Sequence, residues 1–79
     1  MNTGIPLDRL RDGCFAMVTE LTAKGPARRR LLDLGLVPGT KVEVIRRSPL
    51  GDPIAFNIRG AVIAFRKEDA GQVLVIQVS

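Results

Sequence analysis

Gly35 lies where a helical segment of the chain gives way to a strand-forming one. It follows a leucine-rich stretch at helical spacing, residues 31–34, and precedes Pro38. Glycine readily adopts the left-handed conformation that ends helices, and Leu36 can then pack back onto the last turn. Pro26 suits the first turn, where its missing N–H costs nothing. The predicted helix has about two to three turns, too few to be stable alone in water, so it must pack against other elements.

Much of the remaining chain has the apolar patterns of short β-strands. Residues 48–53 are dense in turn-forming residues and predict a hairpin, and Gly60 predicts a second tight turn. Leu7–Leu10 are expected to form a short lead-in, and residues 67–71 a single helical turn or a loop. Alternating and continuous apolar runs predict about five strands, at residues 13–21, 40–47, 54–59, 61–66 and 73–78.

A meander of this kind is most economically closed into a small barrel, which hides the edges of the sheet. We therefore predict a mainly β fold: a small β-barrel of about five strands, with one short α-helix between strands one and two. The 79 residues are expected to make one domain, residues 1–79, with a thin core. Because the chain has no Trp or Tyr and only 3 Phe, that core must consist mainly of Val, Leu, Ile and Ala.

The cellular compartment is indicated by what the sequence lacks. The single cysteine, Cys14, rules out an intramolecular disulfide and fits a reducing compartment. The N-terminus has no apolar run with the basic flank of a signal peptide, and no window reaches the ~18 apolar residues of a membrane span. We expect a cytoplasmic protein that contacts a membrane only through a partner.

Residues suited to catalysis or metal binding are sparse. The chain has no histidine, no Gly-rich phosphate loop and no carboxylates paired on opposing strands. Cys14 stands alone and is expected to pack as a small apolar residue. Of the scattered acidic residues only Glu68 and Asp69 are adjacent, and they would form at best a weak, solvent-filled site. The sequence therefore predicts a non-enzyme without a cofactor or a tight metal site, in which any transition-metal binding is weak.

Four segments of the chain are informative through their order and spacing. They are LLDLGLVPG at residues 31–39, the pair Val42 and Val44, PLGDP at residues 49–53, and Arg59-Gly60. Together they resemble the FeoA family, the small ferrous iron transport protein A, over nearly the whole chain. The resemblance implies an SH3-like barrel that acts in bacterial Fe(II) uptake. It also implies a partner, a FeoB-type membrane GTPase, which the protein would bind as an adaptor at the inner face of the membrane.

Against the pattern expected of this family, several apolar residues stand where a solvent-facing polar residue is usual. These are Phe15, Met17, Val62, Leu74 and Ile76. One interpretation is that a thin barrel uses both faces of strands that lie under a helix or a loop. The other is a hydrophobic surface for docking or weak self-association that includes Phe15 and Met17, since exposed apolar patches on small proteins often mark interfaces.

The run Arg28-Arg29-Arg30 is the main charged feature. It belongs to a chain with 12 basic and 8 acidic residues, whose net charge of +4 suits an acidic protein surface, a nucleic acid or an anionic lipid. The arginines can form a solvated helix face, with Arg29 and Arg30 pairing with Asp33 at helical spacing. Alternatively, they face an acidic patch of the GTPase, where a guanidinium makes paired hydrogen bonds with carboxylates.

Two other functions fit parts of the sequence. The net charge and several arginines on or near strands favour a nucleic-acid-binding barrel; these are Arg46, Arg47, Arg59 and Arg66. Such a barrel needs surface aromatic residues for base stacking, whereas Phe56 and Phe65 are expected in the core, so no nucleic acid is the expected partner. The third function is a free-standing sensor related to the C-terminal domain of iron-dependent repressors, although no DNA-reading helix-turn-helix accompanies it here.

Overall fold

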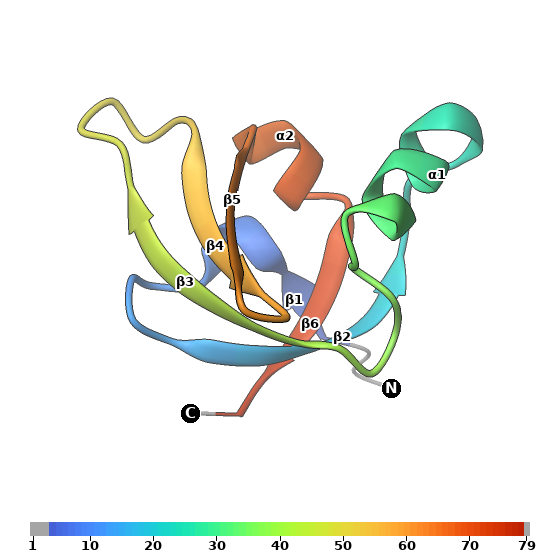
Figure 1. Ribbon diagram of the computed structural model, residues 1–79, viewed down its shortest axis with the longest axis horizontal. Helices are drawn as coiled ribbons and strands as arrows, with labels where there is room; N and C mark the ends of the chain where they lie inside the picture. Colours follow the sequence, from blue (N-terminus) through green and yellow to red (C-terminus); the bar gives the residue numbers. More distant parts are fainter. Residues whose placement is uncertain (1–3, 79) are drawn as a thin grey trace.

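The structure is a computed structural model that describes residues 4–78. A strongly curved β-sheet surrounds a small core, with two helices on the same side of it (Figure 1). In chain order the elements are β1 (Ile5–Pro6), the 3₁₀ turn η1 (Leu7–Arg9), β2 (Phe15–Leu21), α1 (Gly25–Asp33), β3 (Lys41–Arg47), β4 (Ile54–Ile58), β5 (Ala61–Phe65), α2 (Lys67–Ala70) and β6 (Val73–Gln77). The five long strands lie within the ranges predicted from the sequence, and α1 follows the first of them.

The strands form one antiparallel sheet in the order β1-β6-β2-β3-β4-β5. The register shifts between Val18 and Glu20 and between Val44 and Arg46, and such bulges bend a strand. The mainly β fold is confirmed, but among the described residues β1 and β5 are free edges, so the sheet curls without closing. β1 is only 2 residues long and contains Pro6, which has no N–H to extend the ladder.

The concave side of the sheet holds the core. Buried side chains alternate along the strands, as the apolar patterns predict. Phe56 and Phe65 are both buried there, as expected, and their rings stack with centroids 4.6 Å apart. The other strand residues in this core are Ala16, Val18, Leu21, Val42, Val44, Ile54, Ile58, Val73 and Val75.

α1 stops at the glycine predicted to end it. Gly35 has a φ angle of +101°, and its N–H donates to the Leu32 carbonyl at 2.9 Å. The N–H of Leu36 donates to the Leu31 carbonyl at 3.1 Å, which completes the Schellman arrangement common at helix ends. Leu31 and Leu36 are both buried, so the stop also packs α1 against the core. Pro26 lies in the first turn, as predicted.

The segment before β2 is more ordered than the lead-in predicted for Leu7–Leu10. Ile5–Pro6 pairs with β6 and makes a sixth strand, and the chain then enters η1. Leu7 and Leu10 are buried, with exposed fractions of 0% and 2%. A two-residue strand is too short to show an alternating pattern, which explains why the sequence did not reveal it.

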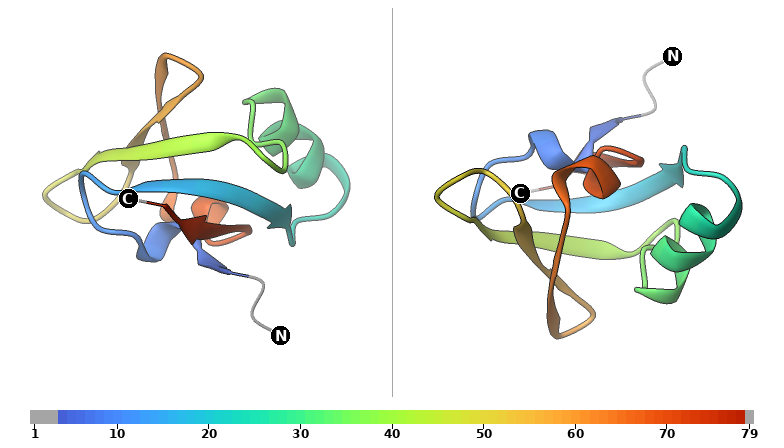
Figure 2. Two further views of the ribbon diagram at one scale, coloured as in Figure 1. Left: turned by 90° about the horizontal axis from the view of Figure 1, so that it is seen from below. Right: turned by 90° about the horizontal axis from the view of Figure 1, so that it is seen from above.

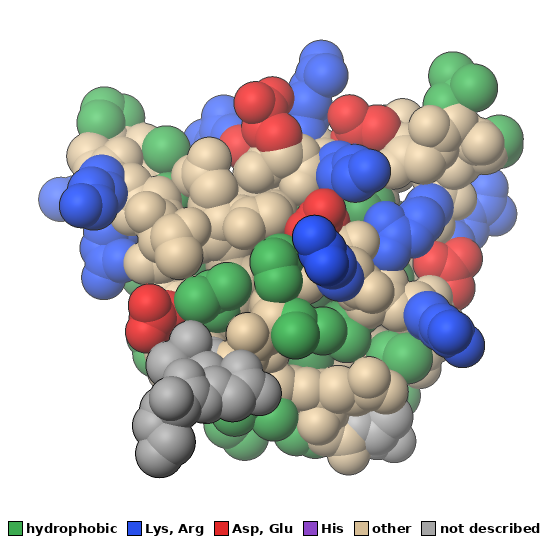
Figure 3. Space-filling model, turned by 180° about the vertical axis from the view of Figure 1, so that it is seen from behind, with side chains coloured by type: hydrophobic (Ala, Val, Ile, Leu, Met, Phe, Trp, Pro, Cys, Tyr) green, Lys and Arg blue, Asp and Glu red, His purple; other side chains and the backbone are tan. Residues whose placement is uncertain are grey.

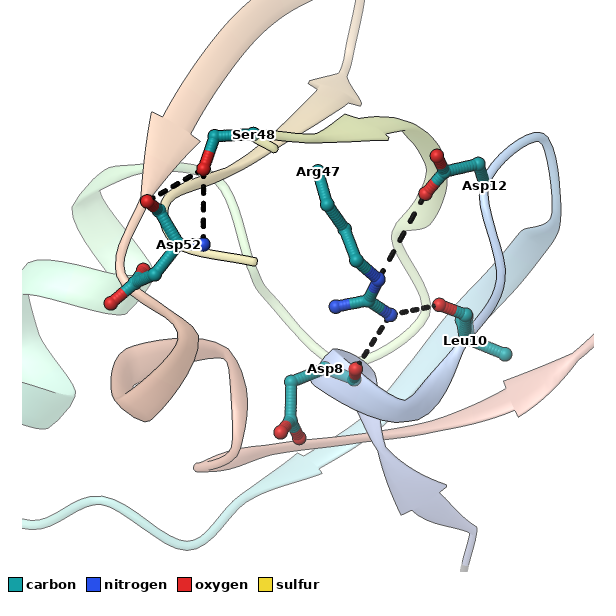
Figure 4. A network of polar contacts seen from close by, with 6 residues as sticks. All are labelled: Asp8, Leu10, Asp12, Arg47, Ser48 and Asp52. Atoms are coloured by element: carbon teal, nitrogen blue, oxygen red, sulfur yellow. Dashed lines mark hydrogen bonds and ion pairs between the residues drawn. The ribbon is translucent and has the colours of Figure 1, made fainter. Parts of the chain in front are cut away.

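The guanidinium of Arg47 fastens this segment to β3. Nη2 donates to the carbonyl of Asp8 at 2.7 Å and to that of Leu10 at 2.5 Å, and Nε lies 3.9 Å from a carboxylate oxygen of Asp12 (Figure 4). The Arg47 side chain is 29% exposed. It therefore serves the fold, because it satisfies carbonyl groups at the end of η1 that have no partner within that turn.

Candidate interaction surface

The convex side of the sheet carries an apolar surface that begins on β2. Phe15 and Met17 alternate along the strand with the buried Ala16 and Val18, so their side chains point away from the core. Met17 is 43% exposed, whereas Phe15 is half-buried. The structure therefore places both residues on the side where a partner can reach them.

β6 and the residue that follows it supply the other half of this surface. Ile76 is the cross-strand partner of Met17, and the N–H of Val78 donates to the Phe15 carbonyl at 2.9 Å. Ile76 and Val78 are 49% and 48% exposed. We call Phe15, Met17, Ile76 and Val78 the outer apolar face. Val78 is not among the apolar residues singled out in the sequence, although its alternation with Ile76 in the last apolar run was a usable signal.

A basic side chain and a shallow hollow border the outer apolar face. Nζ of Lys41 lies 4.9 Å from the centroid of the Phe15 ring, within the range of cation–π attraction. Beside them an open hollow of about 210 Å³ is lined in part by Glu43, Asn57 and Arg59. Apolar, basic and acidic groups meet here on an open surface, which suits contact with a protein better than enclosure of a small molecule.

The two remaining apolar residues singled out in the sequence differ in position: Leu74 shares its side of β6 with Ile76, and Val62 lies on β5. Val62 is 67% exposed but belongs to β5, at the opposite edge of the sheet from β1 and β6. Leu74 is half-buried and pairs with Pro6 of β1. The outer apolar face therefore ends well short of Val62.

Arg30 is tied to α2. Its Nη2 atom lies 2.6 Å from Oδ2 of Asp69, and the two side chains are 62% and 18% exposed. Arg30 therefore does not make the pair with Asp33 that the interpretation as a solvated helix face allowed. The two helices lie on the same side of the sheet (Figure 1), so α2 offers a carboxylate to α1 although 39 residues separate this pair in the sequence.

Of the three arginines of α1, Arg28 and Arg29 are not held by an ion pair among the described residues. Both are exposed, and Nη1 of Arg28 makes a long hydrogen bond, 3.4 Å, to the carbonyl of Leu21. Within residues 4–78 the guanidinium of Arg29 has neither an ion pair nor a hydrogen bond. Arg29 can therefore meet a carboxylate of another protein without first breaking an internal contact.

The arginines of α1 and the outer apolar face lie on different sides of the molecule. α1 stands beyond the end of β2, on the side of the sheet that also carries α2 (Figures 1 and 2). The outer apolar face lies on the other, convex side of the sheet. Seen from behind, Lys and Arg side chains alternate with Asp and Glu over the upper part of the surface (Figure 3). Arg47 is held internally, and Phe15 is the only one of the three phenylalanines outside the core, so base stacking on this domain would have a single phenylalanine to use.

Groups suited to metal binding do not converge in the part of the chain that the structure describes. No three His, Cys, Asp or Glu side chains of residues 4–78 lie close enough together to hold an ion. Cys14 is half-buried, and its Sγ accepts a hydrogen bond from Nε2 of Gln77 at 3.5 Å. The carboxylate of Asp69 is already paired with Arg30. Among the same residues, no helix has the length and apolar character needed to cross a membrane.

Comparison with known proteins decides the family. The FeoA domain family matches residues 5–77. The chain belongs to the FeoA domain family. It is 32% identical over 73 residues to a Porphyromonas gingivalis protein described as an Fe(2+) transport protein A/Fe(2+) transporter FeoB fusion protein. That match covers 92% of this chain but only 9% of the fusion protein, so the FeoA domain corresponds to a small part of that relative.

Solved structures of FeoA proteins share the fold. A FeoA-like protein from Clostridium acetobutylicum matches with a TM-score of 0.92 at 32% identity, over 100% of this chain and 92% of that one. FeoA from Stenotrophomonas maltophilia, described as a prokaryotic SH3 domain protein and solved with zinc, matches at 0.77 and 29% identity, over 87% and 86% of the two chains. The predicted SH3-like fold is thus confirmed. A manganese-dependent transcriptional repressor shares this fold at 19% identity, with a TM-score of 0.87 over 99% of this chain and 43% of the repressor.

Proposed function

We propose that this FeoA domain is a single-domain accessory protein of bacterial ferrous iron uptake, which binds a FeoB-type membrane GTPase and modulates or assembles it. The observation that carries the proposal is the Porphyromonas gingivalis relative, in which a similar segment is fused to FeoB. Two domains fused in one relative commonly work in one assembly, so separate chains of the same kinds are expected to associate. The domain performs no catalysis itself, and it works on the cytoplasmic side of the membrane, where its partner holds it.

The outer apolar face is the proposed contact surface, and the arginines of α1 orient the partner. Three of the four residues of that face are at least 43% exposed, so covering them gains free energy from the hydrophobic effect. Arg28 and Arg29 carry charge without a close internal counter-ion, and such groups mainly steer association and fix orientation. Iron itself is cargo of the transporter and is not carried in a tight site of this domain.

Capture of the transporter from native bacterial membranes tests the proposal. The tagged protein is used as bait with and without a guanine nucleotide, and mass spectrometry identifies what it retains. We expect the iron-transport GTPase, and a difference between the two conditions identifies the nucleotide state that is preferred. Recovery of RNA-associated proteins alone, or of nothing above background, would contradict the proposal.

A pair of variants assigns the surface. Phe15→Ser with Met17→Ser removes apolar area from the outer apolar face and should abolish capture. The matched control is Leu50→Ser in the loop between β3 and β4, which also removes an exposed apolar side chain, 94% exposed, but elsewhere. Equal capture by the two variants would exclude the outer apolar face as the contact.

Anaerobic calorimetry with Fe(II) tests the statement about iron. Titration of the isolated domain should give no stoichiometric tight binding, because the described residues bring no three ligating side chains together. The zinc in the Stenotrophomonas maltophilia structure makes Zn(II) the natural second titrant. A tight 1:1 Fe(II) isotherm would show that the domain itself holds the cargo.

A further inference from the structure

The two edges of the sheet are protected to very different degrees. Proteins usually guard edge strands with charged residues, proline, bulges or short length, because a free edge can pair with another chain. β1 is guarded in two of these ways, since it has 2 residues and contains Pro6. β5 has the sequence Ala-Val-Ile-Ala-Phe, with no charge, no proline and no bulge in its pairing with β4. Of the described edges, β5 is the one competent to accept another strand.

The backbone of β5 offers hydrogen-bonding groups toward solvent. β4 and β5 are joined by the two-residue turn Arg59-Gly60, whose positive φ angles of +55° and +88° match a type I′ hairpin. The pair that closes such a hairpin, Ile58 and Ala61, exchanges hydrogen bonds, and alternate residues of an antiparallel strand repeat this pattern. The N–H and C=O groups of Val62 and Ala64 therefore point away from β4.

These outward groups are accessible. Val62 is 67% exposed and Ala64 is also exposed. Outside the ladder with β4, no backbone hydrogen bond of the described chain involves Val62 or Ala64. In both views of Figure 2 the backbone at the tip of the β4–β5 hairpin stands clear of the other elements, so an incoming strand can approach that end of β5.

The charges at the ends of β5 select the occupant. Arg59 precedes the strand, and Arg66 and Lys67 follow it, with no acidic residue between them. Two copies paired antiparallel along β5 would bring the basic end at Arg59 of one close to the basic end at Arg66 and Lys67 of the other, and like charges brought together disfavour that pairing. A strand with carboxylates at both ends would instead place negative charges beside the basic residues at both ends of β5.

We infer that the edge of β5 binds an extended segment of a partner protein by strand addition, and that this segment is apolar in its middle and acidic at both ends. Main-chain hydrogen bonds to Val62 and Ala64 hold the segment, as in other complexes formed by strand addition, and Arg59 and Arg66 recognise its ends. This inference rests on the proposed function as a protein-binding accessory domain. It identifies a second contact, separate from the outer apolar face.

A synthetic peptide tests the inference on the full chain. The probe alternates valine and threonine and carries two aspartates at each end; a second peptide has lysines in place of the aspartates. With the aspartate peptide, amide hydrogen exchange of Val62 and Ala64 should slow, while that of Ala61 and Ile63, already bonded to β4, should change little. Binding of the lysine peptide should be at least about tenfold weaker. Equal binding of the two peptides, or no protection of Val62 and Ala64, would overturn the inference.

Two substitutions at one position separate the backbone from the side chain. Ala64→Pro removes an N–H that β4 does not use, so the hairpin keeps its ladder, and peptide affinity should fall at least about tenfold. The control Ala64→Thr keeps the N–H and should bind as the native chain does. Equal peptide affinities of the two variants would overturn strand addition. Slowed amide exchange at Val62 when the protein is concentrated without peptide would overturn the inference too, because the occupant of the edge would then be a second copy of the chain. Because these measurements need no transporter, failed capture of the GTPase with intact peptide binding would remove only the proposed partner.

Discussion

Gly35 ends α1 in a backbone conformation that residues with a side chain rarely adopt. Its φ angle is +101°, and a Cβ atom there would lie 3.1 Å from Cγ2 of Ile58. Gly35→Ala should therefore lower the free energy of unfolding by about 1–3 kcal/mol, measured by chemical denaturation. The control is Gly71→Ala, where φ is −65° and the nearest atom is 3.5 Å away, so the expected change is within about 0.5 kcal/mol. Equal losses would show that the positive φ does not set the cost.

Arg47 stabilises the N-terminal segment by donating hydrogen bonds to the carbonyls of Asp8 and Leu10, which no other side chain of residues 4–78 binds. Arg47→Met keeps much of the apolar stem but removes the donors to Asp8 and Leu10, and should lower the free energy of unfolding by about 1.5–3 kcal/mol. The matched control is the exposed neighbour, as Arg46→Met. A loss in the control as large as in Arg47→Met would attribute the effect to charge and not to the hydrogen bonds.

At the scale of elements, α1 depends on its packing against the core. The helix has 9 residues and would be marginal alone in water. Leu31 is 1% exposed, so Leu31→Ala should destabilise the protein by about 2–5 kcal/mol and speed amide exchange throughout α1. The half-buried neighbour provides the comparison, and Leu32→Ala should cost clearly less. Slow exchange in α1 despite the Leu31 substitution would show that the helix is stabilised locally.

Elements whose signals are local were predictable from the sequence, and contacts between distant segments were not. The stop of α1 follows from Gly35 and its neighbouring leucines, and the exposure of Met17 follows from its alternation with buried residues. The pairing of Met17 with Ile76 depends on the register between β2 and β6, which no local pattern encodes. The contact between Arg30 and Asp69 likewise exists only because the fold brings α1 and α2 together.

At the scale of the whole molecule, the net charge of +4 favours an acidic partner, and the position of the charges should matter. Arg28→Glu with Arg29→Glu should slow association with the nucleotide-binding domain of the proposed GTPase partner by about tenfold at low salt, and flatten the dependence of the rate on salt. Stopped-flow fluorescence measures both quantities. Arg9→Glu with Arg11→Glu makes the same change in net charge at exposed positions outside α1. If both double variants slow association equally, α1 has no special role.

The pairing of the first strand with the last has a mechanical consequence. Ile5 lies opposite Val75, and Pro6 lies opposite Leu74. A force that pulls Ile5 away from β6 would act on the residue pairs of β1 and β6 one after another, first Ile5 with Val75 and then Pro6 with Leu74. Further extension would then have to break the hydrogen bonds that Arg47 donates to the carbonyls of Asp8 and Leu10. Light tension on the N-terminal segment would thus detach β1 alone, whereas separating η1 from β3 needs more force, because both the hydrogen bonds of Arg47 and the core packing of Leu7 and Leu10 must then be lost.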